Sequence, residues 1–258
     1  MSSVRECLIL AAGNGSRMRS VSGVRPKPLI EFRGKPILEQ IIRRASRAGI
    51  ERFTITVGYR SDLIRQWFDQ CRFDHVSVRF VENRDYHKQN GISALKAKDA
   101  VDGNFLLLMA DHIFEARTAR LLIDQPLVSG EVILAVDSRV DRVFDLDDAT
   151  KVRRDGTHIV DIGKEIPDYD ALDTGMFLCT PALFNTLESV AMNGDCSLSD
   201  GMRRLAAQRR FRAFGIGDAD WEDVDTPEAL AHAEQVFESP RGDLCRHRRL
   251  ESAEAVHA

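Results

Sequence analysis

The residues with the clearest chemical potential lie in a glycine-containing loop near the start of the chain. The loop contains Gly13, Asn14 and Gly15, and two cations, Arg17 and Lys27, follow it. Glycine lets backbone N–H groups approach an anion without a Cβ in the way, while arginine and lysine supply full positive charges. The combination predicts a phosphate-binding loop. A tight turn into a helix is the alternative explanation of the two glycines.

Two carboxylates complete the candidate chemistry. Asp111 directly follows the apolar segment 105–110, and Asp225 directly precedes Thr226 and Pro227. Mg²⁺ takes few protein ligands and keeps substrate and water oxygens, so two carboxylates beside a triphosphate would suit it. The sequence around Asp225 is equally typical of a helix N-terminus, with Asp or Thr as the cap and Pro in the first turn. Both roles stay open for Asp225.

The elements that must position these side chains alternate through the first half of the chain. The apolar run 7–10 is typical of a parallel strand covered on both faces, and apolar residues at helical spacing follow at 37–48. Further predicted elements are strands at 52–58, 76–81 and 104–109 and helices at 61–68 and 91–100. The alternation predicts an α/β fold with a doubly wound, mostly parallel, Rossmann-like sheet. Ligands of such sheets bind at the carboxyl ends of the strands.

The pattern changes from residue 131 onward. Short strand candidates alternate with charged turns, at 132–136, 150–152, 159–162 and 175–179. They predict an inserted β-rich lobe in the second half that covers the site. A last helix is expected at 227–237. We therefore expect one domain over residues 1–238 and a disordered polar tail over 239–258.

Composition narrows the class of protein. The 258 residues contain 36 Lys and Arg against 40 Asp and Glu, a net charge of −4. This balance argues against a nucleic acid partner. The five cysteines are odd in number, scattered and without metal-ligand spacing. They favour free thiols and a cytoplasmic location. We find no apolar stretch that predicts a signal peptide or a membrane span.

Four motifs together resemble those of nucleotidyltransferases that join a sugar or alcohol phosphate to a nucleoside triphosphate. They are Leu-Ala-Ala-Gly-Asn-Gly-Ser-Arg at 10–17, Pro-Lys-Pro-Leu at 26–29, the strand-end Asp111, and Asp-Val-Asp-Thr at 223–226. The resemblance covers residues 4 to about 237. Within that superfamily the chain is most similar to CTP:inositol-1-phosphate cytidylyltransferases. The strings that carry this likeness are Asn90-Gly-Ile-Ser93, Met109-Ala-Asp-His112, Ala149-Thr-Lys-Val152, Ile162-Gly-Lys164 and Leu172-Asp-Thr-Gly175-Met-Phe. Ala110 departs from the glycine that usually precedes the aspartate.

The resemblance implies a role for each matching residue. Arg17 and Lys27 would act on the triphosphate as the catalytic cations, and Asp111 and Asp225 would hold Mg²⁺. Nucleotide binding would fall to Leu10, Ala12, Gly13, Asn14, Gly15, Asn90, Gly91 and Ser93. Acceptor binding would fall to Lys164, Thr174 and Gly175. A turn that caps the following helix is an alternative role for Asn90 and Gly91. For His112 we expect a structural role or a role in supporting the metal ligands, and for Trp221 we expect packing.

The expected reaction is Mg²⁺-dependent transfer of a cytidylyl group from CTP to a polyol phosphate, with inositol 1-phosphate favoured and pyrophosphate released. A phosphate monoester is largely dianionic at neutral pH, so the nucleophile needs no general base. Phosphocholine, aminoethylphosphonate or a hexose 1-phosphate as acceptor, or another nucleoside triphosphate as donor, are alternatives. An inactive nucleotide-binding regulatory protein is a further one. No membrane partner is expected, and a homodimer is possible.

Overall fold

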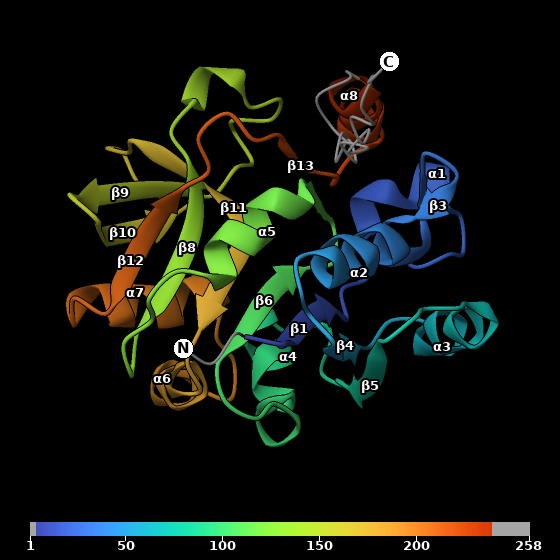
Figure 1. Ribbon diagram of the computed structural model, residues 1–258, viewed down its shortest axis with the longest axis horizontal. Helices are drawn as coiled ribbons and strands as arrows, with labels where there is room; N and C mark the ends of the chain where they lie inside the picture. The colour runs from blue at the N-terminus through green and yellow to red at the C-terminus, as the bar shows by residue number, and fades with distance from the viewer. Residues whose placement is uncertain (1–3, 239–258) are drawn as a thin grey trace, which may run out of the picture.

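The computed structural model describes residues 4–238, and its central feature is a nine-stranded sheet with the order β5-β4-β1-β6-β11-β8-β12-β10-β9 (Figure 1). The strands are β1 Glu6–Ala11, β4 Arg52–Val57, β5 Ser77–Glu82, β6 Phe105–Met109, β8 Val132–Asp137, β9 Lys151–Asp155, β10 His158–Gly163, β11 Ala171–Cys179 and β12 Phe211–Gly215. Two short pairs lie outside it: β2 Glu31–Phe32 with β3 Lys35–Pro36, and β7 His112–Phe114 with β13 Trp221–Asp223.

The first half of the sheet agrees with the sequence. Strands β5, β4, β1 and β6 run parallel to one another. Their carboxyl ends therefore share one edge, where the glycine-containing loop follows β1 and Asp111 follows β6.

The sheet as a whole is mixed, so the expectation of a mostly parallel sheet was wrong. Strand β11 runs antiparallel to both β6 and β8, and β10 runs antiparallel to both β12 and β9. Parallel neighbours need a crossover of a dozen or more residues. The connection between β9 and β10 consists of Gly156 and Thr157 alone, which permits only a hairpin.

The second half is β-rich, as expected, and it closes on itself. Because β9 also pairs with β11, the strands β11-β8-β12-β10-β9 form a small closed barrel. Strand β11 belongs to this barrel and also pairs with β6, so the barrel continues the main sheet.

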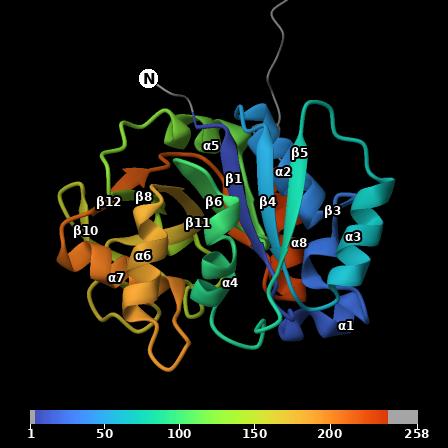
Figure 2. The ribbon, with the colours of Figure 1, turned by 90° about the horizontal axis from the view of Figure 1, so that it is seen from below.

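Helices cover both faces of the sheet, and each face has its own hydrophobic core. Helices α2 Ile37–Arg47, α3 Ser61–Gln70, α5 Ala116–Ile123 and α8 Pro227–Glu238 contribute to one core. Helices α4 Asn90–Lys96, α6 Ala182–Val190 and α7 Leu198–Ala207 contribute to the other. Figure 2 shows α4, α6 and α7 on the opposite side of the strands from α2. Helices α5 and α6 were not predicted from the sequence. A short α1, Arg19–Ser22, follows the first loop.

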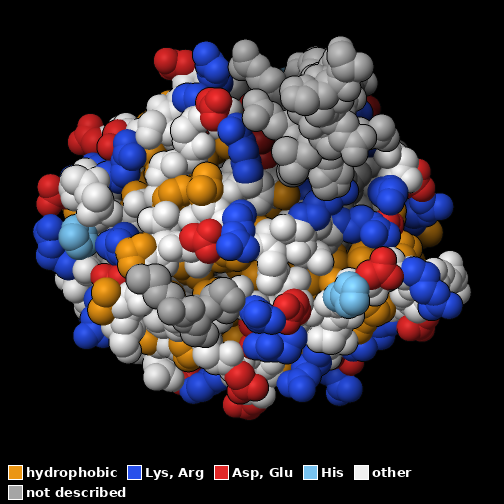
Figure 3. Space-filling view, in the orientation of Figure 1, with side chains coloured by type: hydrophobic (Ala, Val, Ile, Leu, Met, Phe, Trp, Pro, Cys, Tyr) orange, Lys and Arg blue, Asp and Glu red, His pale blue; other side chains and the backbone are white. Residues whose placement is uncertain are grey.

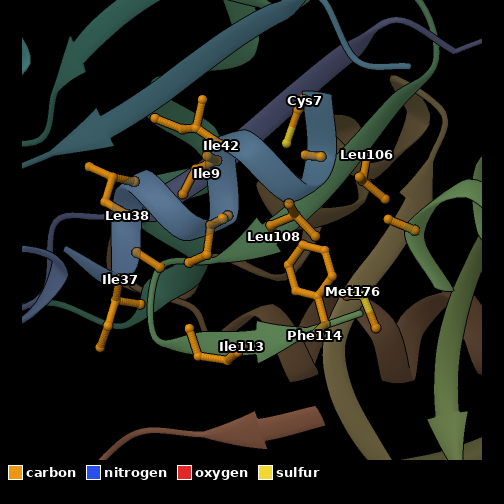
Figure 4. Packing of buried hydrophobic residues seen from close by; sticks show 14 of the residues in the cluster. Cys7, Ile9, Ile37, Leu38, Ile42, Leu106, Leu108, Ile113, Phe114 and Met176 are labelled. Carbon is orange, nitrogen blue, oxygen red and sulfur yellow. The ribbon is translucent and has the colours of Figure 1, made fainter. Parts of the chain in front are cut away.

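Strand β1 contributes side chains to both hydrophobic cores. Successive side chains of a strand point to opposite faces. Cys7 and Ile9 accordingly pack in the core beneath α2, together with Leu106 and Leu108 of β6 (Figure 4), whereas Leu8 and Leu10 belong to the other core. Covering on both faces explains why the run is apolar without alternation.

The described residues bear on three expectations, which concern membrane spans, free cysteines and surface charge. No helix within residues 4–238 combines the length and the apolar character needed to cross a membrane. Cys7, Cys71, Cys179 and Cys196 are free thiols. Cys245 and the tail 239–258 lie outside the described residues. Basic and acidic side chains are both spread over the face in Figure 3.

Candidate active site

Two cavities meet at the carboxyl ends of β1 and β6. The loop-side cavity, of about 270 Å³, is lined by Leu10, Gly13, Asn14, Gly15, Arg17, Lys27, Asp111 and Asp225 together with four neighbouring residues. The barrel-side cavity, of about 380 Å³, opens toward the barrel and α8. Its lining includes Asn90, Asp111, His112, Asp148, Lys164, Asp173, Gly175, Trp221 and Asp225. Asp111 and Asp225 line both cavities and thus mark their junction.

The first loop is shaped by Gly15. This residue has a φ of +55°, and a Cβ there would lie 2.6 Å from Lys27 Cβ. Only glycine combines that backbone conformation with such a close approach. The packing brings Lys27 beside the loop that carries Arg17. Ala12 is buried, and its carbonyl accepts a hydrogen bond from Tyr59 N–H at 3.0 Å.

Lys27 lies between the two carboxylates. Its Nζ donates to Asp111 Oδ2 at 2.8 Å and also contacts Asp225 Oδ1. The side chain is only 8% exposed. Arg17 binds the other oxygen of Asp225. The predicted catalytic cations and metal ligands therefore form one contiguous cluster, although Asp225 comes from the far end of the sequence.

The structure separates the two roles that the sequence left open at the start of α8. Thr226 Oγ1 accepts a hydrogen bond from Ala229 N–H at 3.1 Å, which is the bond of a helix cap. Asp225 is directed at Arg17 and Lys27 instead. Thr226 supplies the cap, and the Asp225 carboxylate belongs to the site.

Two cationic side chains, Lys27 and His112, lie beside the Asp111 carboxylate. Burial by itself would raise the pKa of Asp111, but Lys27 and His112 outweigh it and hold that pKa far below its usual range. Burial disfavours the charged imidazole of His112, whereas Asp223, Asp111 and Asp173 raise its pKa to about 9. Asp111 is therefore an anion at neutral pH, held from two sides by cations.

His112 is held both by Asp111 and by packing against Trp221 and Gly175. Its Nδ1 lies 2.8 Å from Asp111 Oδ1, and its ring stacks on Trp221 with centroids 6.0 Å apart. Gly175, at a φ of +72°, lies against the ring, and a Cβ there would approach His112 Cδ2 to 2.5 Å. Trp221 in turn donates from Nε1 to Asp137 Oδ2 at 2.9 Å.

Two further carboxylates of this cluster were not identified from the sequence. One oxygen of Asp223 is buried and receives no hydrogen bond, and it lies 3.8 Å from His112 Nδ1 and 4.0 Å from Lys27 Nζ. Alternation in an extended chain puts Asp223 and Asp225 on one face, a signal that the sequence did carry. Asp148 lies in the loop between β8 and β9, and its Oδ2 lies 2.6 Å from Arg17 Nη1. No local sequence pattern predicts that contact.

The donor set fits a divalent metal ion. One oxygen each from Asp148, Asp223 and Asp225 lie within 4.8 Å of one another. Carboxylate oxygens are the ligands that Mg²⁺ prefers. The unsatisfied oxygen of Asp223 is the observation that favours a cation here, because a buried carboxylate oxygen without a donor is costly.

The segment 90–93 is tied to the neighbouring helices. Asn90 lines the barrel-side cavity, and its Oδ1 accepts from Leu198 N–H at 2.8 Å. A Cβ at Gly91 would lie 2.6 Å from Cys196 O, so close packing against Cys196 accounts for this glycine. Ser93 is buried and accepts from Asn83 Nδ2 at 3.0 Å. These contacts position the segment beside the cavity.

The predicted acceptor residues lie on two barrel strands or just beyond them. Lys164 follows β10, lines the barrel-side cavity and pairs with Asp148. Asp148 thereby joins Lys164 to Arg17. Gly175 lines the same cavity, whereas Thr174 is fully buried and donates to Ala135 O at 2.8 Å.

The loop-side cavity contains cations, and it meets a second cavity at the carboxylates Asp111 and Asp225. This arrangement suits the transfer of a nucleotidyl group between two substrates, and the family comparison agrees. The protein is a nucleotidyltransferase. The chain belongs to the family described as "MobA-like NTP transferase domain", whose model matches residues 7–213.

Relatives confirm the resemblance to CTP:inositol-1-phosphate cytidylyltransferases. The chain is 35% identical over 231 residues to the "Bifunctional IPC transferase and DIPP synthase" of Rubrobacter xylanophilus, covering 88% of this chain and 51% of the relative. It is 34% identical over 233 residues to the protein of that name from Thermococcus kodakarensis, covering 89% and 50%. The chain thus spans about half the length of these curated relatives.

Solved structures share the fold. The inositol-1-phosphate CTP transferase from T. maritima matches with a TM-score of 0.80 and 27% identity, over 92% of this chain and 96% of that one. A UDP-glucose pyrophosphorylase complexed with UDP-glucose matches with a TM-score of 0.78 at 18% identity, over 92% and 100%. The second match shows the shared fold alone.

Proposed function

We propose that this protein transfers the cytidylyl group of CTP to a polyol phosphate, with inositol 1-phosphate favoured, and releases pyrophosphate. The observation that carries the proposal is the junction of the two cavities at Asp111 and Asp225. A nucleotide in the loop-side cavity and an acceptor in the barrel-side cavity would meet at this carboxylate pair. The relatives named for IPC transfer favour inositol 1-phosphate and CTP over other pairs.

The loop-side cavity suits the nucleotide. Backbone groups of residues 13–15 would face the triphosphate, and Arg17 and Lys27 would neutralise it. Leu10, Ala12 and the segment 90–93 would surround the base and ribose, where pyrimidine recognition by backbone groups is expected. Asn90 lines the barrel-side cavity and not the loop-side one, so a base beside Asn90 would extend across the junction at Asp111 and Asp225.

The barrel-side cavity suits the acceptor. Lys164 would bind the acceptor phosphate, with Gly175 beside it and Thr174 supporting the strand from the interior. Both Lys164 and Arg17 are paired with Asp148, so incoming phosphates would compete with that carboxylate for the two cations. An acceptor phosphate brings up to about two negative charges, against one on the carboxylate, and would therefore compete effectively for these cations.

The chemistry then follows from charge and alignment. A phosphate oxygen of the acceptor attacks the α-phosphorus of CTP, the new P–O bond forms, and the bond to the β-phosphate oxygen breaks to release pyrophosphate. Asp111 and Asp225, with Asp223 and Asp148 beside them, would hold Mg²⁺, whose charge would neutralise the triphosphate. Lys27, buried at the junction, would stabilise the charge on the α-phosphate in the transition state. No residue needs to accept a proton, because the attacking oxygen is already ionised.

The proposal is tested by pyrophosphate release with Mg²⁺. CTP, UTP, dTTP, ATP and GTP are each paired with inositol 1-phosphate, glucose 1-phosphate, phosphocholine and 2-aminoethylphosphonate. Turnover confined to CTP with inositol 1-phosphate is expected. Turnover with another pair would keep the reaction class and change the substrates. Nucleotide binding without turnover in any pair would favour a regulatory protein.

A further inference from the structure

One carboxylate of the barrel-side cavity, that of Asp173, has few hydrogen-bond donors within the protein. Asp173 lines this cavity from β11, at a position where the pairing of β11 with β8 shifts register between Asp173 and Phe177. Its Oδ1 accepts a hydrogen bond from Gly175 N–H at 2.7 Å. Within residues 4–238 this is the one hydrogen bond recorded for the Asp173 carboxylate.

Three other carboxylates of the cavity have protein partners, whereas Asp223 receives no hydrogen bond on Oδ1 and lies near Lys27 and His112. Asp137 accepts three bonds from Arg139 and one from Trp221, all between 2.8 and 2.9 Å. Asp148 is paired with Arg17 and Lys164, and Glu222 lies 2.7 Å from His232 Nδ1. Compared with these groups, Asp173 has an oxygen available to a ligand.

The chemistry of a carboxylate limits what this ligand group can be. An ionised carboxylate only accepts hydrogen bonds, and a phosphate dianion likewise offers no donor. Asp173 therefore cannot bind the acceptor phosphate, for which the cavity holds Lys164. Hydroxyl groups do donate. The ammonium group of aminoethylphosphonate donates as well, whereas the trimethylammonium group of choline could interact with the carboxylate only through its charge.

The pKa of Asp173 also favours a ligand that donates hydrogen bonds. Burial raises the pKa of Asp173 to about 6, and the nearby Asp223 adds to the rise, while Gly175 N–H and His112 oppose it. A perturbed carboxyl in a cavity is characteristic of a ligand-binding position. Donors from a ligand would stabilise the charged form and offset the cost of burial.

We propose that Asp173 determines acceptor specificity by accepting hydrogen bonds from hydroxyl groups of the acceptor, at a distance from the phosphate that Lys164 binds. This inference rests on the proposed function and deepens it. It means that the barrel-side cavity binds polyhydroxylated phosphates and that Asp173 of β11 recognises their hydroxyl groups. The hydrogen bond to Gly175 holds Oδ1 and thereby leaves Oδ2 for the acceptor.

The test replaces Asp173 by asparagine. With Oδ1 still bound to Gly175 N–H, Asp173→Asn presents an NH₂ donor where the wild type presents an acceptor. The KM for inositol 1-phosphate should rise roughly ten- to a hundredfold, the range expected for a lost hydrogen bond to a charged group, whereas the KM for CTP should stay within about twofold. The matched control is Asp170→Asn, an aspartate three positions earlier whose side chain is 49% exposed and pairs with Arg154. Both KM values of this control should match those of the wild type.

A second measurement needs no variant. In the wild type, deoxy analogues of inositol 1-phosphate should identify at least one ring hydroxyl whose removal costs ten- to a hundredfold in kcat/KM. That loss should be largely absent in Asp173→Asn. An unchanged KM in the variant, equal effects on the KM of CTP, or full activity of all deoxy analogues would each overturn the inference while leaving cytidylyl transfer to inositol 1-phosphate intact. A wild type that prefers phosphocholine would overturn both this inference and the inositol assignment. A wild type that prefers hexose 1-phosphate would overturn only the inositol assignment, and the same KM comparison would then use that sugar.

Discussion

At the scale of single residues, Lys27 is far less exposed than Arg17 and Lys164, the other cations named for the site. Its ammonium group lies at the junction of the two cavities, in contact with Asp111 and Asp225, and is nearly inaccessible to water. Charge in such a place interacts strongly, because little solvent screens it. Its neighbour Arg25 is also cationic but 62% exposed, with Glu31 at 3.6 Å. Two lysine- or arginine-type charges, two residues apart, therefore occupy very different environments.

Lys27→Ala should lower kcat on the order of 10²–10³-fold, by analogy with the loss of one positioned donor to a developing charge. Steady-state pyrophosphate release at saturating substrates measures the effect. Arg25→Ala is the matched control and should retain kcat within about twofold. Comparable losses in both variants would show that general electrostatic attraction, and not the position of Lys27, accounts for the rate.

At the scale of elements, the start of α8 combines a structural and a chemical role in adjacent residues. Thr226 satisfies a backbone donor of the first helical turn, and Asp225 contacts the cations. The sequence could not separate the two residues, since either can cap a helix. The direction of the chain as it leaves β13 decides which side chain turns inward.

Thr226→Ala should lower the free energy of unfolding by about 1 kcal/mol, because one helix donor loses its partner. Urea denaturation followed by circular dichroism measures this change. Thr226→Ser keeps the oxygen and should restore most of the stability. An unchanged free energy of unfolding in Thr226→Ala would show that Thr226 does not cap the helix.

At the scale of the whole molecule, Asp137 links the barrel to the segment that carries the site carboxylates. It ends β8, and its carboxylate, only 4% exposed, receives bonds from Arg139 and from Trp221 of β13. Burial by itself would raise the pKa of Asp137, but Arg139, both side chain and backbone N–H, and Trp221 hold it below the usual value. A group with a lowered folded-state pKa stabilises the protein above its unfolded pKa, and this contribution is lost as the pH falls through the folded value.

Asp137→Asn should therefore destabilise the protein at neutral pH by roughly 1.5–3 kcal/mol, the usual range for hydrogen bonds to a charged group. The gap to the wild type should narrow as the pH falls below about 4, where the unfolded carboxyl is protonated. Urea denaturation between pH 3 and pH 7 measures both curves. A gap that stayed constant with pH would mean that shape, and not charge, is what Asp137 contributes.

Local sequence determined the parts of this protein that depend on neighbouring residues. The buried run of β1, the glycine-shaped loop with Arg17, and the aspartate after β6 were predicted because strand periodicity, backbone freedom and charge are local properties. Four strands of the second half were found for the same reason, whereas β12 was not predicted. Their pairing was not predicted either, since the order of strands depends on contacts between distant segments.

Only the tertiary structure decided how those parts combine. The chain must fold before Asp148 reaches Arg17 across 131 positions, and before β11 can join the main sheet and the barrel at once. The solitary partner of Asp173 is likewise a property of the closed cavity and not of the string Leu172-Asp-Thr-Gly175. The physical reason is that burial and the supply of hydrogen-bond donors are set by segments far away in the sequence, whereas the tendency to form a strand, a turn or a cap is set nearby.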